Sequence, residues 1–439
     1  MSAAPWDLLV VGGGPAGLAG AACAAEAGMR VALLDDNLAL GGQIWRAEAT
    51  RDVNTAAARW IRRAATAGAK MVTRARVFDA PAPGVLAAEM NEGDEERRIE
   101  LRYRQLLVAT GARERFLPFP GWTLRNVLGA GGLQAMVKSG LPVAGKRVVI
   151  AGSGPLLAAV AAYLRHHGAE IALLCEQAPA SQTAGLALAL AKYPGKWAPA
   201  AALVWQLAGV RRATNCWPIA AEGDEVLRAV RVLRNGRETR IACDYLACGF
   251  HLVPNLELPL LLGCRTRGGY IEIDEAQRTS VANVFCAGEP TGIAGVDAAL
   301  IGGQIAAAAA AGRPISARQK RARRRWHRFG MALDRACALR AELRLLAGPE
   351  TLVCRCEDVA YARLASCRDW RDAKLQTRCG MGPCQGRVCG PATRFLFGWQ
   401  DVSIRPPLFP VPVASLAAAA TPDTGAEPAF EAVAGKNDS

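Results

Sequence analysis

Residues 7–36 read DLLVVGGGPAGLAGAACAAEAGMRVALLDD, and this stretch decides the fold of the N-terminal part of the chain. An apolar run, a glycine turn, an alanine-rich segment and VALLDD predict strand, turn, helix and strand. Gly12, Gly14 and Gly17 take the G-x-G-x-x-G positions, which permit the tight turn, the approach of a pyrophosphate and close helix–strand packing. Asp35 ends the second strand and can accept hydrogen bonds from ribose hydroxyls. The helix N-terminus favours phosphate, so the stretch predicts a dinucleotide-binding unit.

A second unit of the same kind follows in the middle of the chain. Residues 146–176 read KRVVIAGSGPLLAAVAAYLRHHGAEIALLCE and again predict strand, turn, helix and strand. Gly152 and Gly154 take the first two glycine positions, Leu157 replaces the third glycine, and Glu176 ends the second strand. The leucine indicates looser packing of helix on strand. Three interpretations remain open here: an NAD(P)H site, a site for another adenine nucleotide, and an empty scaffold.

A cluster of cysteines lies late in the chain. Cys354 and Cys356 form a Cys-x-Cys pair, and after 27 intervening residues come Cys384 and Cys389. Four thiolates, two close in sequence and two brought to them by a turn, meet the needs of an iron–sulfur cluster. Zinc also accepts four thiolates, but structural zinc sites favour pairs two to four residues apart. Cys379 is a fifth candidate, because its spacing to Cys384 equals the spacing of Cys384 to Cys389.

Bulk composition limits the classes of protein that fit. The chain has 439 residues, a net charge of +14 and 14 cysteines, and we find neither a signal peptide nor a transmembrane run in it. These features favour a reducing cytoplasm, with the inner face of the membrane as a further location. Residues 313–328 carry eight Lys and Arg side chains in a predicted linker helix. A solvated helix, or one that docks an acidic partner subunit, is favoured over nucleic-acid binding, and contact with a membrane surface is a third interpretation.

Three further motifs give the first unit a resemblance to FAD-dependent pyridine-nucleotide oxidoreductases. They are GGQIW at 41–45, LLVATGARER at 106–115, and NVFCAGEPTGIAGVDAALIGGQIAA at 283–307. In the last motif Glu289 stands where that superfamily usually has Asp. By this resemblance the FAD contacts, beyond the three glycines and Asp35, are Pro15, Ala16, Gly42, Gln43, Thr110, Gly111, Gly288 and Glu289. No C-x-x-C pair occurs in the chain, and GGQIW carries no cysteine in the stretch where lipoamide and glutathione reductases place their redox pair, which excludes flavin disulfide reductases of those types. We assign no catalytic acid or base, since the four histidines are scattered.

The cysteine region resembles a known small domain. CRCEDV at 354–359 and GMGPCQGRVC at 380–389 are similar to the 2Fe–2S domain of bacterioferritin-associated ferredoxin and related flavoproteins. That resemblance implies Cys354, Cys356, Cys384 and Cys389 as the cluster ligands.

The order of all these motifs, over about residues 5–412, resembles the alpha-type subunits of bacterial heteromeric amino-acid and opine dehydrogenases. That group includes octopine and nopaline oxidase subunits, the hydrogen cyanide synthase flavoprotein subunit, and D-hydroxyproline and proline dehydrogenase alpha subunits. The resemblance implies FAD, a 2Fe–2S cluster and a partner flavoprotein beta subunit of glycine or sarcosine oxidase type that oxidises a C–N bond. A small ferredoxin-like subunit and a quinone or respiratory-chain acceptor are further implied partners. A self-contained NAD(P)H:acceptor oxidoreductase is the alternative function.

The predicted fold class is α/β, with two Rossmann-like three-layer dinucleotide-binding domains and a small, mainly helical 2Fe–2S domain. The chain is therefore divided into five parts. They are a split FAD domain at 1–118 and 270–312, an NAD(P)-type domain at 119–269, a basic helical linker at 313–349, the 2Fe–2S domain at 350–400, and a Pro/Ala-rich arm with a disordered tail at 401–439.

Overall fold

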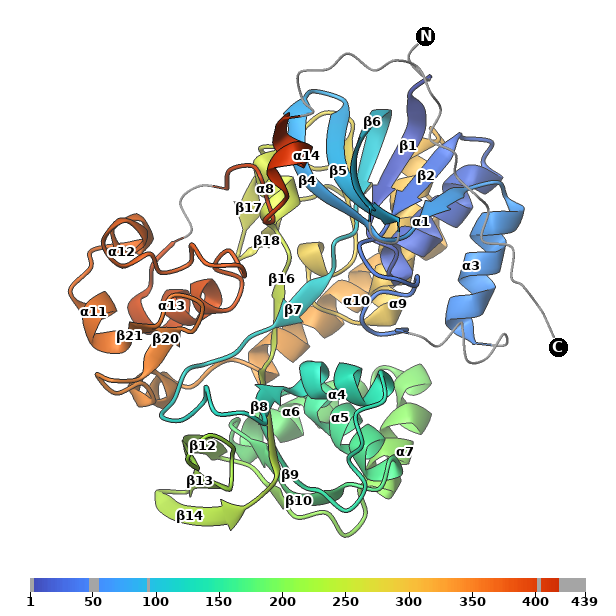
Figure 1. The fold of residues 1–439 in the computed structure, drawn as a ribbon. Helices are drawn as coiled ribbons and strands as arrows, with labels where there is room; N and C mark the ends of the chain where they lie inside the picture. The colour runs from blue at the N-terminus through green and yellow to red at the C-terminus, as the bar shows by residue number, and fades with distance from the viewer. Residues whose placement is uncertain (1–3, 47–54, 93–94, 401–403, 418–439) are drawn as a thin grey trace, which may run out of the picture.

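The computed structural model describes residues 4–46, 55–92, 95–400 and 404–417. Two α/β units lie one above the other, and a small helical part that carries the cysteine cluster sits beside both (Figure 1). The mixed α/β architecture with its Rossmann-like units confirms the predicted fold class.

The first unit is built on a sheet with the strand order β3-β2-β1-β6-β5-β4, in which β19 also pairs with β6. Its strands are β1 (Trp6–Val11), β2 (Val31–Leu34), β3 (Lys70–Val72), β4 (Ala75–Ala82), β5 (Val85–Glu92), β6 (Glu95–Val108) and β19 (Val284–Cys286). The strands β3, β2, β1, β6 and β19 are parallel, whereas β4 and β5 continue the sheet antiparallel. The described helices that pack on this sheet include α1 (Pro15–Glu26), α3 (Ala56–Thr66) and α9 (Val296–Ala310). The apolar faces of α1 and α9 share one core with the sheet.

The second unit has a parallel sheet of order β11-β10-β9-β15-β8. Its strands are β8 (Val127–Gly129), β9 (Arg147–Ser153), β10 (Glu170–Glu176), β11 (Arg212–Ala213) and β15 (Tyr245–Phe250). The helices are α4 (Ala130–Lys138), α5 (Pro155–His166), α6 (Ala180–Leu190) and α7 (Trp197–Gln206), with the 3-10 turn η1 (Pro194–Lys196) between the last two. An antiparallel sheet of β12 (Cys216–Glu222), β13 (Ala229–Arg234) and β14 (Arg237–Ala242) packs against it.

Two antiparallel strands, β7 (Ala112–Glu114) and β16 (Leu252–Pro254), carry the chain from one unit to the other and back. Returning to the first unit, the chain forms α8 (Glu257–Leu261), β17 (Thr266–Arg267), β18 (Tyr270–Ile271), β19 and the 3-10 turn η2 (Glu289–Thr291). Leu258 and Cys264 are already buried in the core of the first sheet. The first unit is thus assembled from two separate stretches of sequence.

The basic segment forms α10 (Ala317–Ala336), which Ser316 and Gln319 begin with a capping box. The 3-10 turn η3 (Ala341–Leu345) leads into the cysteine part. That part consists of β20 (Leu352–Cys354), β21 (Val359–Ala360), α11 (Tyr361–Ala365), α12 (Trp370–Thr377) and α13 (Cys389–Phe397), around a core of its own.

The C-terminal arm returns to the first sheet and ends in α14 (Val413–Ala417). Leu408 is buried in the core of that sheet, and its amide donates a hydrogen bond to the Phe78 carbonyl. The predicted disordered tail lies outside the described residues from 418 onward. Among the described helices, each is too short or too polar to cross a bilayer.

Candidate cofactor and metal sites

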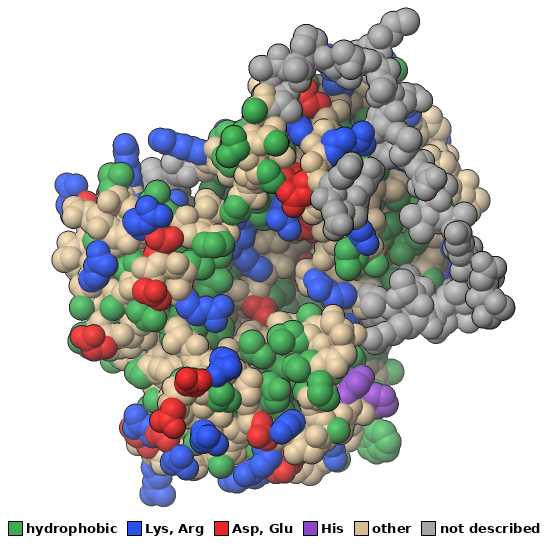
Figure 2. Space-filling view, viewed as in Figure 1, with side chains coloured by type: hydrophobic (Ala, Val, Ile, Leu, Met, Phe, Trp, Pro, Cys, Tyr) green, Lys and Arg blue, Asp and Glu red, His purple; other side chains and the backbone are tan. Residues whose placement is uncertain are grey.

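A cavity of about 2050 Å³ lies between the two α/β units and reaches the cysteine part. The molecule is hollowed where the three parts meet, on the face that Figure 2 shows. Among the residues that the sequence assigns to nucleotide binding, twelve line this cavity: Gly12, Gly14, Pro15, Ala16, Asp35, Gly42, Gln43, Thr110, Gly111, Gly154, Gly288 and Glu289. The fold therefore gathers motifs that are up to 277 residues apart in the sequence (from Gly12 to Glu289) around one space.

The first glycine turn has the shape that a nucleotide site requires. A Cβ on Gly17 would lie 1.8 Å from the carbonyl oxygen of Gly12, so α1 approaches the turn as closely as backbone allows. At Gly14 the nearest atom to an added Cβ is 3.9 Å away, in Gly42, and this space opens to the cavity. Pro15 is the first residue of α1, so the positive end of the helix faces the same opening.

Two carboxyl groups face this end of the cavity. Asp35 accepts hydrogen bonds from the amide of Gly13 at 2.5 Å and from the amide and side chain of Asn37 at 2.8 and 2.7 Å. Burial raises the pKa of Asp35, although these hydrogen bonds oppose the shift. Glu289 lies at the start of η2, and burial alone raises the pKa of its carboxyl to about 7.

The second glycine turn differs from the first. Gly152 packs on the carbonyl of Gly249, and Leu157 is buried in the core below α5. Glu176 is engaged by its own turn, since it accepts hydrogen bonds from the Gly154 amide at 2.8 Å, the Ser153 hydroxyl at 3.0 Å and the Ala178 amide at 2.9 Å.

The segment Cys337–Arg340 covers the edge of the second sheet that an adenosine would occupy. A Cβ on Gly154 would lie 2.8 Å from the Cys337 sulfur. The fully buried Gln177, next to Glu176, donates to the Ala338 carbonyl at 3.0 Å and accepts from the Arg340 amide at 3.2 Å. In the first unit, by contrast, the corresponding end around Asp35 opens to the cavity. The second glycine turn does reach the cavity, through Ser153, Gly154 and Pro155, so the two units differ in access at the acidic end of the site.

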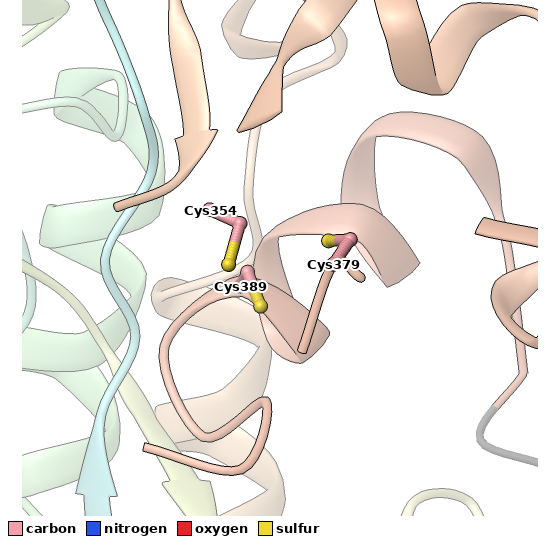
Figure 3. Close-up of side chains that lie close together, drawn as sticks. All are labelled: Cys354, Cys379 and Cys389. Atoms are coloured by element: carbon pink, nitrogen blue, oxygen red, sulfur yellow. The ribbon is translucent and has the colours of Figure 1, made fainter. Parts of the chain in front are cut away.

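Three buried cysteines come together in the small part. The sulfur atoms of Cys354, Cys379 and Cys389 all lie within 4.8 Å of one another, and Figure 3 shows the three side chains close together. Strand β20 supplies the first, the loop after α12 the second, and the first turn of α13 the third. Hydrogen bonds from Cys379 and Cys389 lower the pKa of the Cys354 thiol to about 2.

Two further cysteines extend this group. Cys384 interacts with Cys389, which lowers the pKa of its thiol to about 5, and it also contacts Cys356. Amides of the surrounding loop point at the sulfur atoms: Gly380 and Glu357 donate to Cys354, and Gly386 and Val388 donate to Cys384. Five thiols therefore form one continuous site, and this set contains the four predicted ligands together with the fifth candidate.

The donor set fits a cluster that carries negative charge, because thiolates and N–H groups directed at sulfur are the features that stabilise one. The loop can wrap this closely because it is rich in glycine. A Cβ on Gly382 would lie 2.4 Å from the Cβ of Cys356. Of the arginines beside the ligands, Arg378 pairs with Glu357 at the surface, and Arg387 turns toward the first unit.

A bridge of polar side chains joins the cysteine loop to the nucleotide cavity. Arg113 donates to the Arg387 carbonyl at 3.1 Å, pairs with Glu257 at 2.9 Å, and donates to the Asn255 side chain at 2.6 Å. Asn255 in turn exchanges two 2.8 Å hydrogen bonds with Thr110. Sequence reasoning missed Arg113 and Asn255. The only available signal was the position of Arg113, three residues after the threonine of the A-T-G motif.

A second polar group lies where the two units meet α10. His251 has a left-handed backbone (φ 67°), and its ring lies 3.1 Å from the carboxylate of Asp334. Tyr270 donates to the same carboxylate at 3.0 Å. His251, which the sequence left without a role, thereby helps to hold the two units to α10.

Comparisons with known proteins agree with this arrangement. The model of the pyridine nucleotide-disulphide oxidoreductase family matches residues 6–313. One opine oxidase subunit of Rhizobium meliloti is 32% identical over 94% of this chain and 98% of its own length. The hydrogen cyanide synthase subunit HcnB of Pseudomonas aeruginosa is 32% identical over 92% of this chain and 96% of its own length.

The solved structure of L-proline dehydrogenase from P. horikoshii superposes with a TM-score of 0.65, at 19% identity, over 94% of this chain and 79% of that one. This likeness concerns the fold and extends beyond the two α/β units. Together with the two relatives it confirms the resemblance that the motifs predicted.

Proposed function

Because the chain belongs to the pyridine nucleotide-disulphide oxidoreductase family, it is an FAD-dependent oxidoreductase, and we propose that it is the electron-transfer subunit of a heteromeric amine or amino-acid dehydrogenase. In this proposal the chain holds FAD in the cavity of the first unit and a 2Fe–2S cluster in the thiol site. When bound, these groups supply two-electron and one-electron transfer.

The observation that carries the proposal is the connection between the two sites. Arg113 spans from the carbonyl of Arg387, in the cysteine loop, to Asn255 and so to Thr110 in the flavin motif. The bridge fixes the position of the thiol site relative to the cavity. A fixed distance and orientation between two redox groups is what an electron-transfer protein has to provide.

The chain's own residues bind and orient in this scheme. The open space at Gly14 and the N-terminus of α1 receive a pyrophosphate, and Asp35 receives ribose hydroxyls. For the cluster we propose Cys354, Cys356, Cys384 and Cys389 as ligands, with Cys379 packed beside them.

We propose that a second chain oxidises the C–N bond. The relatives are described as subunits of an opine oxidase and of a hydrogen cyanide synthase, and the alpha subunit of a Corynebacterium sarcosine oxidase also matches part of this chain. The expected partner is a flavoprotein of glycine or sarcosine oxidase type, and a small ferredoxin-like subunit and a quinone-linked acceptor complete the proposal. Secondary amines such as proline, hydroxyproline or opines, and glycine, are the expected substrates.

The alternative, direct reduction by NAD(P)H, has less support. Its binding site would be the second unit, where Gln177 and the segment Cys337–Arg340 cover the edge that an adenosine needs. Rapid mixing of the flavin-loaded chain with NADH is therefore expected to leave the flavin absorbance unchanged. Bleaching within the mixing time would restore the alternative.

The main proposal is tested with the isolated chain and with the chain co-produced with its partner. The isolated chain is expected to bind FAD and to show a 2Fe–2S EPR signal after reduction, without turnover of an amine. Adding the partner subunit should give amine oxidation coupled to reduction of a quinone analogue. Sustained amine oxidation by the isolated chain would refute the assignment as an electron-transfer subunit.

A further inference from the structure

Helices α6 and α7 are apolar in composition and lie at the surface of the second unit. None of the residues of α6 or of α7 is buried, although neither helix carries a charged side chain. Four large apolar side chains of this pair are exposed: Leu188 to 75%, Trp197 to 55%, Val204 to 60% and Trp205 to 80%. Exposed apolar side chains in this number mark a surface that binds a partner molecule or a membrane.

The charges around the pair point to an anionic occupant. From Gln177 to Ala221 the sequence contains no Asp or Glu, whereas it contains Lys192 in the turn between the helices. Helix α10 packs beside α6, and Arg325 donates to the Lys192 carbonyl at 3.1 Å. Arg321 and Arg328 are exposed and share the helix face of Arg325, four residues before it and three after it.

We propose that α6–α7 and this face of α10 form a docking surface for an anionic phospholipid bilayer. Tryptophan and leucine on a helix that lies in the interface insert their apolar parts below the headgroups, while flanking Lys and Arg contact the lipid phosphates. The two exposed tryptophans, the uncharged helices and the basic flank provide these elements together. Trp205 also lines the part of the cavity that lies beside the second unit. The surface otherwise uses no residue of the first glycine turn or of the thiol site, so it would give the electron carrier a membrane location.

The bilayer is favoured over an acidic protein partner by the composition of the surface. An acidic protein would be recognised by the cations of α10, and tryptophans also occur at protein interfaces. There, however, a polar rim surrounds them, whereas α6 and α7 carry no charged side chain. A bilayer accounts for both features, since its interface is anionic outside and apolar a few ångströms below.

The experiment is co-sedimentation of the full chain, and of its complex with the partner subunit, with vesicles. Binding is expected to vesicles that contain about one-third phosphatidylglycerol and to be at least about tenfold weaker with phosphatidylcholine alone. The variant Leu188→Glu/Trp205→Glu should lose about tenfold or more of the binding, and Arg321→Gln/Arg328→Gln should lose the preference for phosphatidylglycerol. Leu375→Glu, at an equally exposed leucine of α12, is the matched control and should bind as the unaltered chain does.

Retained flavin absorbance and circular dichroism identify variants that fold. Three results would overturn the proposal: no binding of the unaltered chain to phosphatidylglycerol vesicles, equal binding by the Leu188→Glu/Trp205→Glu variant, or loss of the partner subunit from that variant while vesicle binding persists. The last result would assign the surface to a protein partner. Vesicle binding by the full chain alone needs neither turnover nor the partner subunit, so the first two results are independent of the proposed function.

Discussion

The carboxyl of Glu289, half-buried in the wall of the cavity, gives a quantitative prediction. Burial raises its pKa from 4.5 to about 7, and no opposing interaction contributes. The folded chain therefore holds this proton more tightly than the unfolded chain does. The contribution of this proton to the free energy of unfolding is fully present below pH 4.5. It decreases as the pH rises from 4.5 to about 7, and the free energy of unfolding no longer changes through this group at higher pH. At about 1.4 kcal/mol per pH unit, ionised Glu289 destabilises the first unit by about 3 kcal/mol.

The variant Glu289→Gln removes this ionisation and keeps the shape of the side chain. It should match the unaltered chain within about 1 kcal/mol at pH 5 and exceed its stability by about 3 kcal/mol at pH 8. For a unit of this size, a gain of that magnitude raises the unfolding temperature by about 6–12 °C. The measurement is thermal unfolding of the flavin-free chain at both pH values.

Glu225→Gln is the control, since that carboxylate lies at the surface with 81% of its side chain exposed. It should change the unfolding temperature equally little at pH 5 and at pH 8. If Glu289→Gln also shows no difference between the two pH values, the carboxyl is not buried as described and the reasoning fails.

Three further predictions concern the cofactor sites. Cys379→Ser should keep the iron content and EPR signal of the chain, whereas Cys389→Ser should lose both; the reverse result would exchange the two ligands. Arg113→Met should weaken the attachment of the cysteine part by about 1.5–3 kcal/mol, because it breaks a charge-assisted hydrogen bond and leaves Glu257 with only the more distant Arg387, at 3.9 Å; limited proteolysis should then release that part sooner. Gly14→Val should give a folded chain without flavin, since the added side chain fills the open space in front of α1; a yellow variant with normal FAD content would contradict this role.

Local constraints explain why the first unit could be predicted from sequence. Gly17 and Asp35 are required by contacts inside one strand–turn–helix–strand stretch, with the Gly12 carbonyl and the Gly13 amide, and Gly12 is required there by its positive φ of 107°. The A-T-G and last FAD motifs could be placed by resemblance, and both line the cavity. The cysteines of the thiol site were found for the same reason, because the loop around them is short and rich in glycine.

Contacts between distant segments could not be predicted. Arg113 and Arg387 are 274 residues apart, and nothing near either one signals that they meet. The cover over the second nucleotide edge likewise depends on where α10 ends against β10, which is a property of tertiary packing. Access to a site is therefore harder to infer from sequence than the presence of its motif.

The late return of the chain to its first sheet has a consequence for biosynthesis. Strand β19 completes the parallel part of that sheet and pairs with β6, whose last residue precedes it by 176 residues (from Val108 to Val284). A ribosome has made about two thirds of the polypeptide before this strand can pair, and the arm with Leu408 emerges later still. All strands of the second sheet, from β8 to β15, have therefore been synthesised while the first sheet is still incomplete. Flavin uptake is thereby deferred until most of the protein has been translated.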